Sequence, residues 1–405
     1  MEHLNADFGG ARITGYGVGP VLEKFAGVSR IAVLRGGGLG DLMYALPAVA
    51  ALKAAYPEAS VTLLGTPIQA ELLSRIDGPV DETVVVPFSE GVRPGAEDEG
   101  ELKEFFDRMQ ARKFDLAVQV HGGGRFSNPF LLRVAARHTV GTGTPDAARL
   151  ERTLPYLYYQ HEPLRALEVA GLAGAPPVGL EARIRALPVF RQELTATVDA
   201  LFPAAFPSAF PSARAGGTVV IHPGATDPRR RWPAERFGAV ARKASDDGFR
   251  VLVIGDRSEK ELAEAVVEHA VGRVAMHTPP HGAPQVGSLA GELGLGELAV
   301  LLAECSVVVA NDSGPRHLAQ ALGTPTVGVF WAGNAINAAP LGRGLHRIHL
   351  GWATHCPVCG IDITQVGWTA PRCGHDESTV EAVTPESVYE DVLQLTAMNL
   401  PLRGR

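Results

Sequence analysis

Short apolar runs alternate along the chain with longer segments in which apolar residues recur every three or four positions. The segment from Leu42 to Ala55 has this helical spacing, and Tyr56-Pro57 ends it because proline cannot continue a helix. Buried strands are predicted by the apolar runs at 30–34, 60–65, 83–87 and 114–120. Strands alternating with helices indicate βαβ units and a parallel sheet.

A second series of the same kind fills the other half of the chain. Strands are expected at 218–222, 250–255, 306–311 and 324–331. Helices are expected at 233–247, 258–270, 296–304 and from Pro385 onward. Residues 276–292, rich in Pro, Gly and His, are expected to form a loop.

The two series predict an α/β protein with two Rossmann-like, doubly wound domains. The Pro/Ala/Ser-rich stretch at 201–217 is expected to be the linker. We therefore expect an N-terminal domain over residues 1–210 and a C-terminal domain over 211–405. The last helix is a candidate to pack back on the N-terminal domain.

Composition and charge narrow the function class. Hydrophobic residues make up 46% of 405 residues and charged residues 20%, which is typical of a folded globular protein. The net charge of -7 disfavours a non-specific nucleic-acid binder. The first residues lack the apolar stretch of a signal peptide, and no run of about 18 apolar residues occurs. We expect a cytoplasmic protein.

The first candidate motif is the loop GGGLGD at 36–41, between a strand and a helix. Glycines there let the backbone approach a ligand, and the helix start supplies N–H donors. The loop lacks the lysine of a P-loop, and Asp41 stands where the dinucleotide fingerprint has Gly or Ala. Asp41 either caps the helix or acts as a base at a ligand-facing strand end.

Two further motifs follow strands in the second half. HPGATDPRRRW, at 222–232, places Arg229, Arg230 and Arg231 after a strand, where guanidinium groups suit a diphosphate. The alternative is a solvated basic loop. NDSGPRH, at 311–317, places free amides at a helix start and His317 one turn later, which is an anion site or a plain helix cap.

The three motifs together resemble glycosyltransferase family 9, the lipopolysaccharide ADP-heptose heptosyltransferase family. The matching stretches are RGGGLGDLMYALPAVAALKAAYP, IHPGATDPRRRWPAERF and NDSGPRHLAQALGTPTVGVFW, and the resemblance covers roughly residues 30–395. It implies the glycosyltransferase B architecture, in which two Rossmann-like domains face each other across a cleft. The acceptor would then lie on the N-terminal half and the donor mainly on the C-terminal half.

The resemblance also implies roles for individual residues. Asp41 matches the catalytic base, with Gly38 and Gly40 in the loop near acceptor and phosphate. Arg230 stands where the family commonly has a lysine that contacts the donor phosphates. Donor binding falls to Thr226, Glu259 (on a loose alignment), Asp312, Ser313, Gly314 and His317.

The implied activity is inverting transfer of a heptose or related sugar from a nucleoside-diphosphate sugar, with an ADP-sugar favoured. The acceptor would be a saccharide or glycolipid of the lipopolysaccharide-core or cell-envelope type, reached with at most peripheral membrane contact at the inner face of the cytoplasmic membrane. No cofactor is expected for catalysis. The alternatives are a non-catalytic nucleotide-sugar-binding protein and a nucleotide-sugar epimerase of the same fold.

Three of the four cysteines and a histidine gather near the C-terminus. Cys356 and Cys359 form a C-x-x-C pair, and Cys373 and His375 follow as C-x-H. Two closely spaced pairs of soft ligands suit tetrahedral zinc. The interpretations left open are a structural zinc site and free thiols in a loop.

Overall fold

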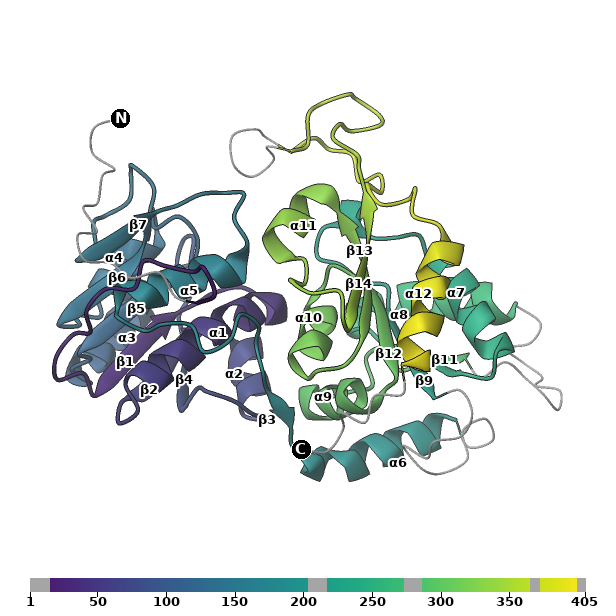
Figure 1. Cartoon of the computed structure of the whole chain (residues 1–405), viewed down its shortest axis with the longest axis horizontal. Coiled ribbons are helices and arrows are strands. Elements are labelled where there is room, and N and C mark those ends of the chain that lie inside the picture. The colour runs from purple at the N-terminus through teal and green to yellow at the C-terminus, as the bar shows by residue number, and fades with distance from the viewer. Residues whose placement is uncertain (1–14, 203–216, 273–285, 365–371, 399–405) are drawn as a thin grey trace. The chain divides into compact units, whose positions relative to one another are not determined.

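Two parallel six-stranded sheets, one in each half of the chain, organise the computed structural model (Figure 1). The structure describes residues 15–202, 217–272, 286–364 and 372–398. The chain divides into two units, residues 1–184 and 185–405. None of the helices in these described ranges combines the length and the apolar character that crossing a bilayer requires.

The sheet of the first unit has the strand order β4-β2-β1-β5-β6-β7. Its strands are β1 (Arg30–Leu34), β2 (Ser60–Gly65), β4 (Glu82–Val85), β5 (Leu116–Gln119), β6 (His138–Gly143) and β7 (Arg152–Pro155), and a short β3 (Ile76–Asp77) lies outside the sheet. The helices are α1 (Leu39–Ala55), α2 (Pro67–Leu73), α3 (Glu99–Ala111), α4 (Ser127–Leu132) and α5 (Glu162–Leu172). The apolar residues of β1 and β5 are fully buried, as expected for central parallel strands.

The sheet of the second unit has the strand order β11-β10-β9-β12-β13-β14. Its strands are β9 (Thr218–His222), β10 (Arg250–Val253), β11 (Val286–Ser288), β12 (Val307–Asn311), β13 (Thr326–Trp331) and β14 (His346–Gly351), preceded by a short β8 (Arg185–Ala186). The helices are α6 (Arg191–Leu201), α7 (Ala234–Asp246), α8 (Lys260–Val271), α9 (Leu295–Glu304), α10 (Gly314–Ala321), α11 (Ala332–Ala338) and α12 (Pro385–Ala397). Single 3-10 turns cover Pro188–Phe190, Pro228–Arg230 and Arg257–Glu259.

Both sheets follow the same connection rule. Numbered by their appearance within each unit, the six strands lie in the order 3-2-1-4-5-6, and every pair is parallel. This is the Rossmann order, so the expected α/β fold with two doubly wound domains is confirmed. The order reverses between β1 and β5 in one sheet and between β9 and β12 in the other, and ligands of such sheets bind at this point.

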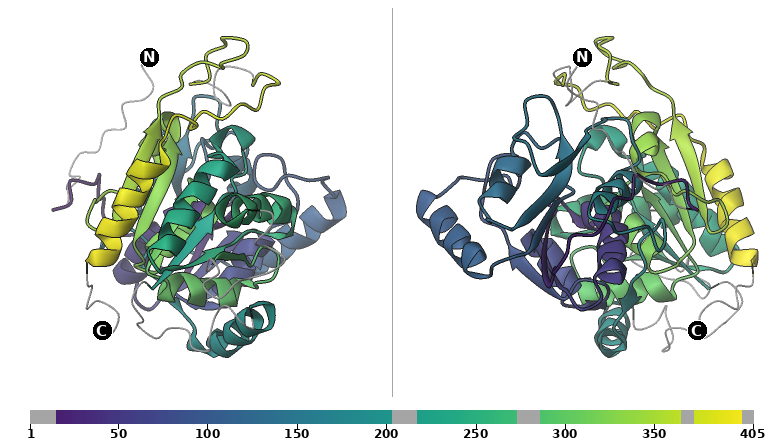
Figure 2. Two further views of the ribbon diagram at one scale, coloured as in Figure 1. Left: turned by 90° about the vertical axis from the view of Figure 1, so that its right-hand side faces the viewer. Right: turned by 60° about the vertical axis from the view of Figure 1, so that its left-hand side comes forward.

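The division between the units falls before α6, whereas the sequence placed the domain boundary at 210/211. Helix α6 belongs with the second unit because it packs on α9, where Thr197 donates a hydrogen bond of 2.9 Å to Glu297. Most of the expected linker, residues 203–216, lies outside the described residues. The last helix, α12, packs on α7, β12 and β13 of its own unit, and the left view of Figure 2 shows it along the second sheet.

Several elements were not expected from the sequence. Residues 286–288 of the expected loop at 276–292 form β11, while 273–285 lie outside the described residues. Strand β6 reads HTVGTG and strand β14 reads HRIHLG, so neither shows an uninterrupted apolar run. Their places in the sheets are set by pairing with β5 and β13.

Trp232 fixes the end of the arginine-rich loop in the second unit. Its side chain is fully buried and its ring packs edge-on against Phe237 at 4.8 Å between centroids. The indole Nε1–H donates to the Val383 carbonyl at 3.0 Å, and the backbone N–H donates to Asn311 Oδ1 at 3.0 Å. One residue thus joins the loop after β9 to the end of β12 and to the segment before α12.

We expect Trp232→Phe to lower the free energy of unfolding by about 1–3 kcal/mol, because the buried Val383 carbonyl loses its donor and the smaller ring leaves a void. Urea denaturation followed by circular dichroism measures the change. The matched control is Trp352→Phe, whose side chain is 73% exposed, and its change should stay within about 0.5 kcal/mol. Equal denaturation midpoints for the two variants would contradict this role of Trp232.

Candidate functional site

The sequence motifs lie where each sheet reverses its strand order. In the first unit Asp41 lies in the first turn of α1, directly after the loop that follows β1, and in the second unit the loops after β9 and β12 carry Arg230 and Asp312. The carboxyl ends of parallel strands share one edge of a sheet. The two motifs of the second unit are therefore brought together, although 82 positions separate Arg230 from Asp312.

Asp41 lies in the first turn of α1 and makes two contacts through its carboxylate. One oxygen accepts the backbone N–H of Gly38 at 2.9 Å, and the other accepts Arg35 Nη2 at 2.6 Å. The carboxylate therefore does cap the helix, as one of the two interpretations held. Its side chain is still 41% exposed, so an incoming hydroxyl group can reach it.

Arg35, which sequence reasoning did not single out, holds Asp41 in place. It is buried at the end of β1 and also donates to the Val120 carbonyl at 2.5 Å and to Glu162 at 3.1 Å. Burial lowers the pKa of Arg35, but the charges of Asp41 and Glu162 outweigh it, so the net pKa lies above the ordinary value. Burial raises the pKa of Asp41, yet Arg35 and the Gly38 N–H bring it below its ordinary value. Asp41 is thus ionised at neutral pH.

His121 follows β5 and braces the same loop. Its Nδ1 accepts the Gly36 N–H at 3.2 Å, so Nε2 carries the proton and donates to the Gly91 carbonyl at 2.9 Å. Burial and then the charge of Arg35 hold the pKa of His121 below its ordinary value, so the ring is neutral at pH 7. The only sequence signal for Arg35 and His121 is that each follows a central strand.

The glycines after β1 are required by the protein's own packing. A Cβ on Gly36 would lie 2.3 Å from the Val92 carbonyl oxygen. Gly37 has φ +89°, and a Cβ there would lie 2.3 Å from a carboxylate oxygen of Asp41. By contrast, a Cβ on Gly38 would meet no atom within 4 Å, so this position is open. Gly40, the second expected loop glycine, lies inside α1.

Asp312 is the centre of the second unit's polar cluster. It is buried, and its carboxylate accepts His317 Nε2 at 2.8 Å, Asn334 Nδ2 at 2.7 Å and Arg230 Nη1 at 3.2 Å. Burial raises the pKa of Asp312, but the His317 hydrogen bond and nearby positive charges outweigh it and hold the pKa well below its ordinary value. Asp312 therefore positions Arg230 and His317. Asn334, on α11, was not found from the sequence.

The His317 ring has a defined proton position. Arg316, fully buried on the same helix, has only donors, and its Nη2 lies 2.6 Å from His317 Nδ1. Nδ1 is therefore the acceptor, and Nε2–H donates to Asp312. Arg316 and Asp312 are both buried, so the His317 ring contacts Asp312 from the interior of the unit.

Ser313, His222 and Glu259 form a second chain of contacts in this unit. His222 Nε2 lies 3.2 Å from Glu259 Oε2, and His222 Nδ1 lies 2.9 Å from Ser313 Oγ. Burial raises the pKa of Glu259, but its contact with His222 brings it below the ordinary value. A Cβ on Gly224 would lie 1.7 Å from Glu259 Oε1, so the loop after β9 passes directly against this carboxylate. Three strand ends are thus joined.

Each of the three arginines at 229–231 contacts an acidic or carbonyl oxygen of this protein. Arg229 is paired with Asp227, and Arg231 Nε donates to the Ala225 carbonyl at 3.0 Å. Arg230 pairs with Asp312 and has a 24% exposed side chain, which leaves its other N–H groups for a ligand. Thr226 is exposed in the same loop, and Gly314 begins α10. Together they offer a partly exposed cation beside a helix start, an arrangement suited to phosphate oxygens.

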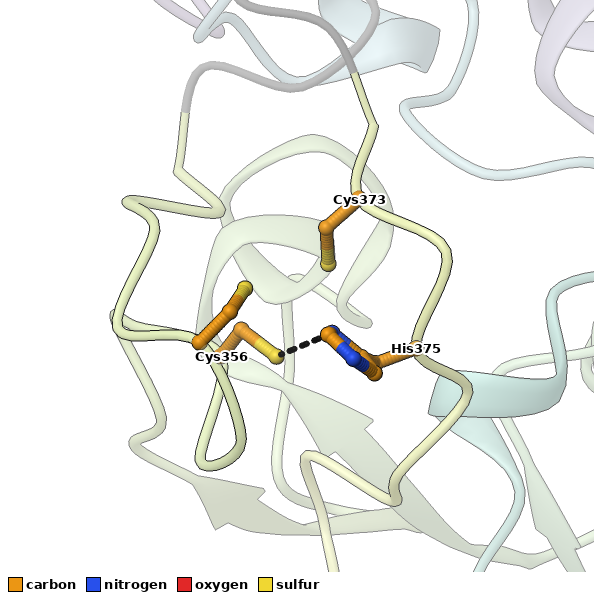
Figure 3. A group of neighbouring side chains, drawn as sticks. Cys356, Cys373 and His375 are labelled. Carbon is orange, nitrogen blue, oxygen red and sulfur yellow. Dashed lines mark hydrogen bonds between the residues drawn. The ribbon is translucent and has the colours of Figure 1, made fainter.

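Cys356, Cys359, Cys373 and His375 converge in the segment between β14 and α12 (Figure 3). Their ligand atoms all lie within 4.8 Å of one another, and Cys356 Sγ lies 3.6 Å from His375 Nδ1. The set could hold a metal ion. Cys305 lies elsewhere, buried at the end of α9.

Two comparisons of the sequence with known proteins point to the same family of glycosyltransferases. Residues 172–357 match the model of glycosyltransferase family 9 (heptosyltransferase). The chain is 23% identical over 365 residues to lipopolysaccharide heptosyltransferase 2 of Escherichia coli strain K12, which covers 90% of this chain and 97% of that protein.

Solved structures share the fold. That of E. coli ADP-heptose lipopolysaccharide heptosyltransferase II superposes with a TM-score of 0.64 at 18% identity, covering 91% of this chain and 98% of that one. A dodecameric iron-containing glycosyltransferase from enterotoxigenic E. coli superposes with a TM-score of 0.50 at 15% identity, covering 93% of this chain and 78% of that one. The family model, the relative and the shared fold agree, so the chain is a glycosyltransferase similar to the heptosyltransferases of glycosyltransferase family 9.

Proposed function

We propose that the enzyme transfers a heptose or a closely related sugar from a nucleoside-diphosphate sugar to a saccharide acceptor, with inversion at the anomeric carbon. The observation that carries the proposal is the cluster at the ends of β9 and β12, where Asp312 holds Arg230 beside the start of α10. This is the place at which Rossmann-like sheets take nucleotides. The name of the E. coli structure, which includes ADP-heptose, favours an adenine nucleotide as the donor.

On the donor side, Arg230 and the backbone amides at Ser313 and Gly314 would bind the diphosphate. Negative charge grows on the leaving phosphate oxygen as the sugar departs, so donors fixed before the reaction stabilise the transition state. Asp312 is a positioning residue for Arg230. Glu259 and Thr226, on neighbouring loops, would contact the ribose and the donor, respectively.

Asp41 would act as the general base. The acceptor hydroxyl oxygen attacks the anomeric carbon from the face opposite the diphosphate, its proton passes to an Asp41 oxygen, and the bonding electrons leave with the diphosphate. A carboxylate with a lowered pKa is a weak base, but the hydroxyl proton becomes acidic as the new C–O bond forms. Arg35 keeps Asp41 ionised and pointing in a fixed direction.

The acceptor proposed is a saccharide or glycolipid of the lipopolysaccharide core, because the E. coli relative is named for that activity. The reaction would take place in the cytoplasm, with at most peripheral contact at the inner face of the membrane. A structural zinc ion at the Cys/His cluster belongs to the proposal, but it would take no part in bond making or breaking.

The direct test is incubation with ADP-heptose and a heptose-terminated core saccharide, followed by measurement of ADP release and of the product's anomeric configuration by NMR. We expect stoichiometric ADP and an inverted linkage. Donor binding without ADP release would indicate a non-catalytic binding protein. An isomerised nucleotide sugar without transfer would indicate an epimerase. Either result would overturn the proposal.

We expect Asp41→Asn to reduce kcat by about 10²- to 10⁴-fold, because the amide cannot accept the proton. The Kd for ADP should stay within about twofold, since the amide oxygen can still cap α1 and the donor contacts are unchanged. Steady-state kinetics and calorimetry measure the two quantities. A loss of kcat smaller than about fivefold would rule out Asp41 as the base.

We expect Arg230→Ala to raise the Kd for ADP about tenfold or more, because a hydrogen bond to a charged group contributes about 1.5–3 kcal/mol. Arg230→Lys should recover most of the affinity, since it restores the charge but not the guanidinium fork. Arg242→Ala, an exposed arginine on α7, is the matched control and should bind ADP as the wild type does. Equal affinity of Arg230→Ala and the control would contradict the assignment.

A further inference from the structure

The two ends of the segment between β14 and α12 contact each other, and its first part is hydrogen-bonded to β13. A Cβ on Gly351 would lie 2.2 Å from the Thr379 carbonyl oxygen, so the two legs of the segment touch. Near the first leg, Trp331 Nε1 donates to the Ala353 carbonyl at 2.6 Å. The described residues of this segment form no helix or strand of their own. An irregular segment of this length needs other contacts to fix its shape.

The Cys/His cluster can supply those contacts through a metal ion. A tetrahedral zinc ion with Zn–S of about 2.3 Å and Zn–N of about 2.0–2.1 Å keeps its ligand atoms about 3.5–3.8 Å apart. The Cys356 Sγ to His375 Nδ1 distance of 3.6 Å, drawn in Figure 3, already has this value. The largest separation in the cluster, within 4.8 Å, exceeds it by about 1 Å, which small side-chain rotations can close.

Backbone N–H groups surround the sulfur atoms of the first two ligands. The N–H groups of Val358 and Cys359 donate to the Cys356 sulfur, and that of Ile361 donates to the Cys359 sulfur. Gly360, with φ +69°, closes this turn, and its N–H donates to the Cys356 carbonyl at 2.9 Å. Hydrogen bonds to ligand atoms fix the orientation of those atoms. Three such sulfurs and one imidazole are the donor set of a structural zinc site.

The segment that follows the last two ligands holds the arginine loop, residues 227–231. Thr379 donates to the Arg229 carbonyl from its backbone N–H at 2.7 Å and from its hydroxyl at 2.9 Å. Ser378 Oγ donates to the Arg231 carbonyl at 2.7 Å. Both neighbours of Arg230 are therefore held by Ser378 and Thr379, which lie three and four positions after His375.

We propose that one zinc ion bound by Cys356, Cys359, Cys373 and His375 fixes residues 372–379 and thereby holds the arginine loop in the conformation that binds the donor diphosphate. The zinc site stands on the cluster itself, while its effect on the donor rests on the proposed function. The ion would act as a structural clamp whose removal weakens nucleotide binding without touching the nucleotide.

The metal is tested by elemental analysis of protein purified without chelators. We expect about one zinc per chain in the wild type and less than about 0.2 in His375→Ala and in Cys359→Ser. The matched controls are His355→Ala, an exposed histidine beside the cluster, and Cys305→Ala, the cysteine outside it; both should keep the metal. Iron in place of zinc, or a metal-free chain with a Cys356–Cys359 disulfide, would overturn the proposal.

The effect on the donor is tested by calorimetry with ADP. We expect the Kd to rise about tenfold or more in His375→Ala and in wild-type protein stripped with a chelator, and to recover when zinc is added back to the stripped protein. The stripped wild type avoids the risk that a variant misfolds. An unchanged Kd after stripping would overturn the clamp. Zinc-loaded wild type that binds no nucleotide would instead contradict the proposed function and leave the zinc site supported.

Discussion

A buried carboxylate needs compensation, and in the second unit this requirement determines how the site is assembled. Asp312 can remain ionised in the interior only because Arg230, His317 and Asn334 all donate to it. These donors come from the loop after β9, from α10 and from α11. One charge therefore sets the relative positions of three segments, and the cation proposed for the donor phosphates is one of its partners. Arg230 would thus interact both with the carboxylate of Asp312 and with the diphosphate of the donor.

In the first unit the charge that is buried at the strand-order reversal is positive instead of negative. There the buried charge is the cation Arg35, and Asp41 and Glu162 neutralise it from α1 and α5. His121 completes the loop as a neutral ring. In the first unit Arg35, which follows β1, is bound by Glu162 of α5. In the second unit Arg230, which follows β9, is bound by Asp312, which follows β12. In each case the partner comes from the other side of the point at which the strand order reverses. The protein's own contacts thus orient Asp41 and Arg230.

Much of this arrangement could be predicted from the sequence, for a physical reason. The central strands are continuous apolar runs, so their positions and the strand-end motifs at Asp41, Arg230 and Asp312 were evident. Strands β6 and β14 contain Gly, Thr and His, and only pairing with a neighbour makes them strands. Arg35, Glu162 and Asn334 were missed because their roles depend on contacts between distant elements. The glycines at 36 and 37 were expected to let the backbone approach a ligand closely. In the structure the Val92 carbonyl packs against Gly36 and the Asp41 carboxylate against Gly37.

The close approach of Gly37 to Asp41 has a consequence for changing the enzyme's substrate in the laboratory. Any side chain at position 37 would displace the carboxylate, so Gly37 cannot be replaced while Asp41 keeps its position. Random libraries over 36–41 would then return mostly inactive clones. Gly38, which has open space around it, is the single tolerant position among the three consecutive glycines at 36–38. Diversity aimed at a new acceptor is better introduced in other loops of the first unit.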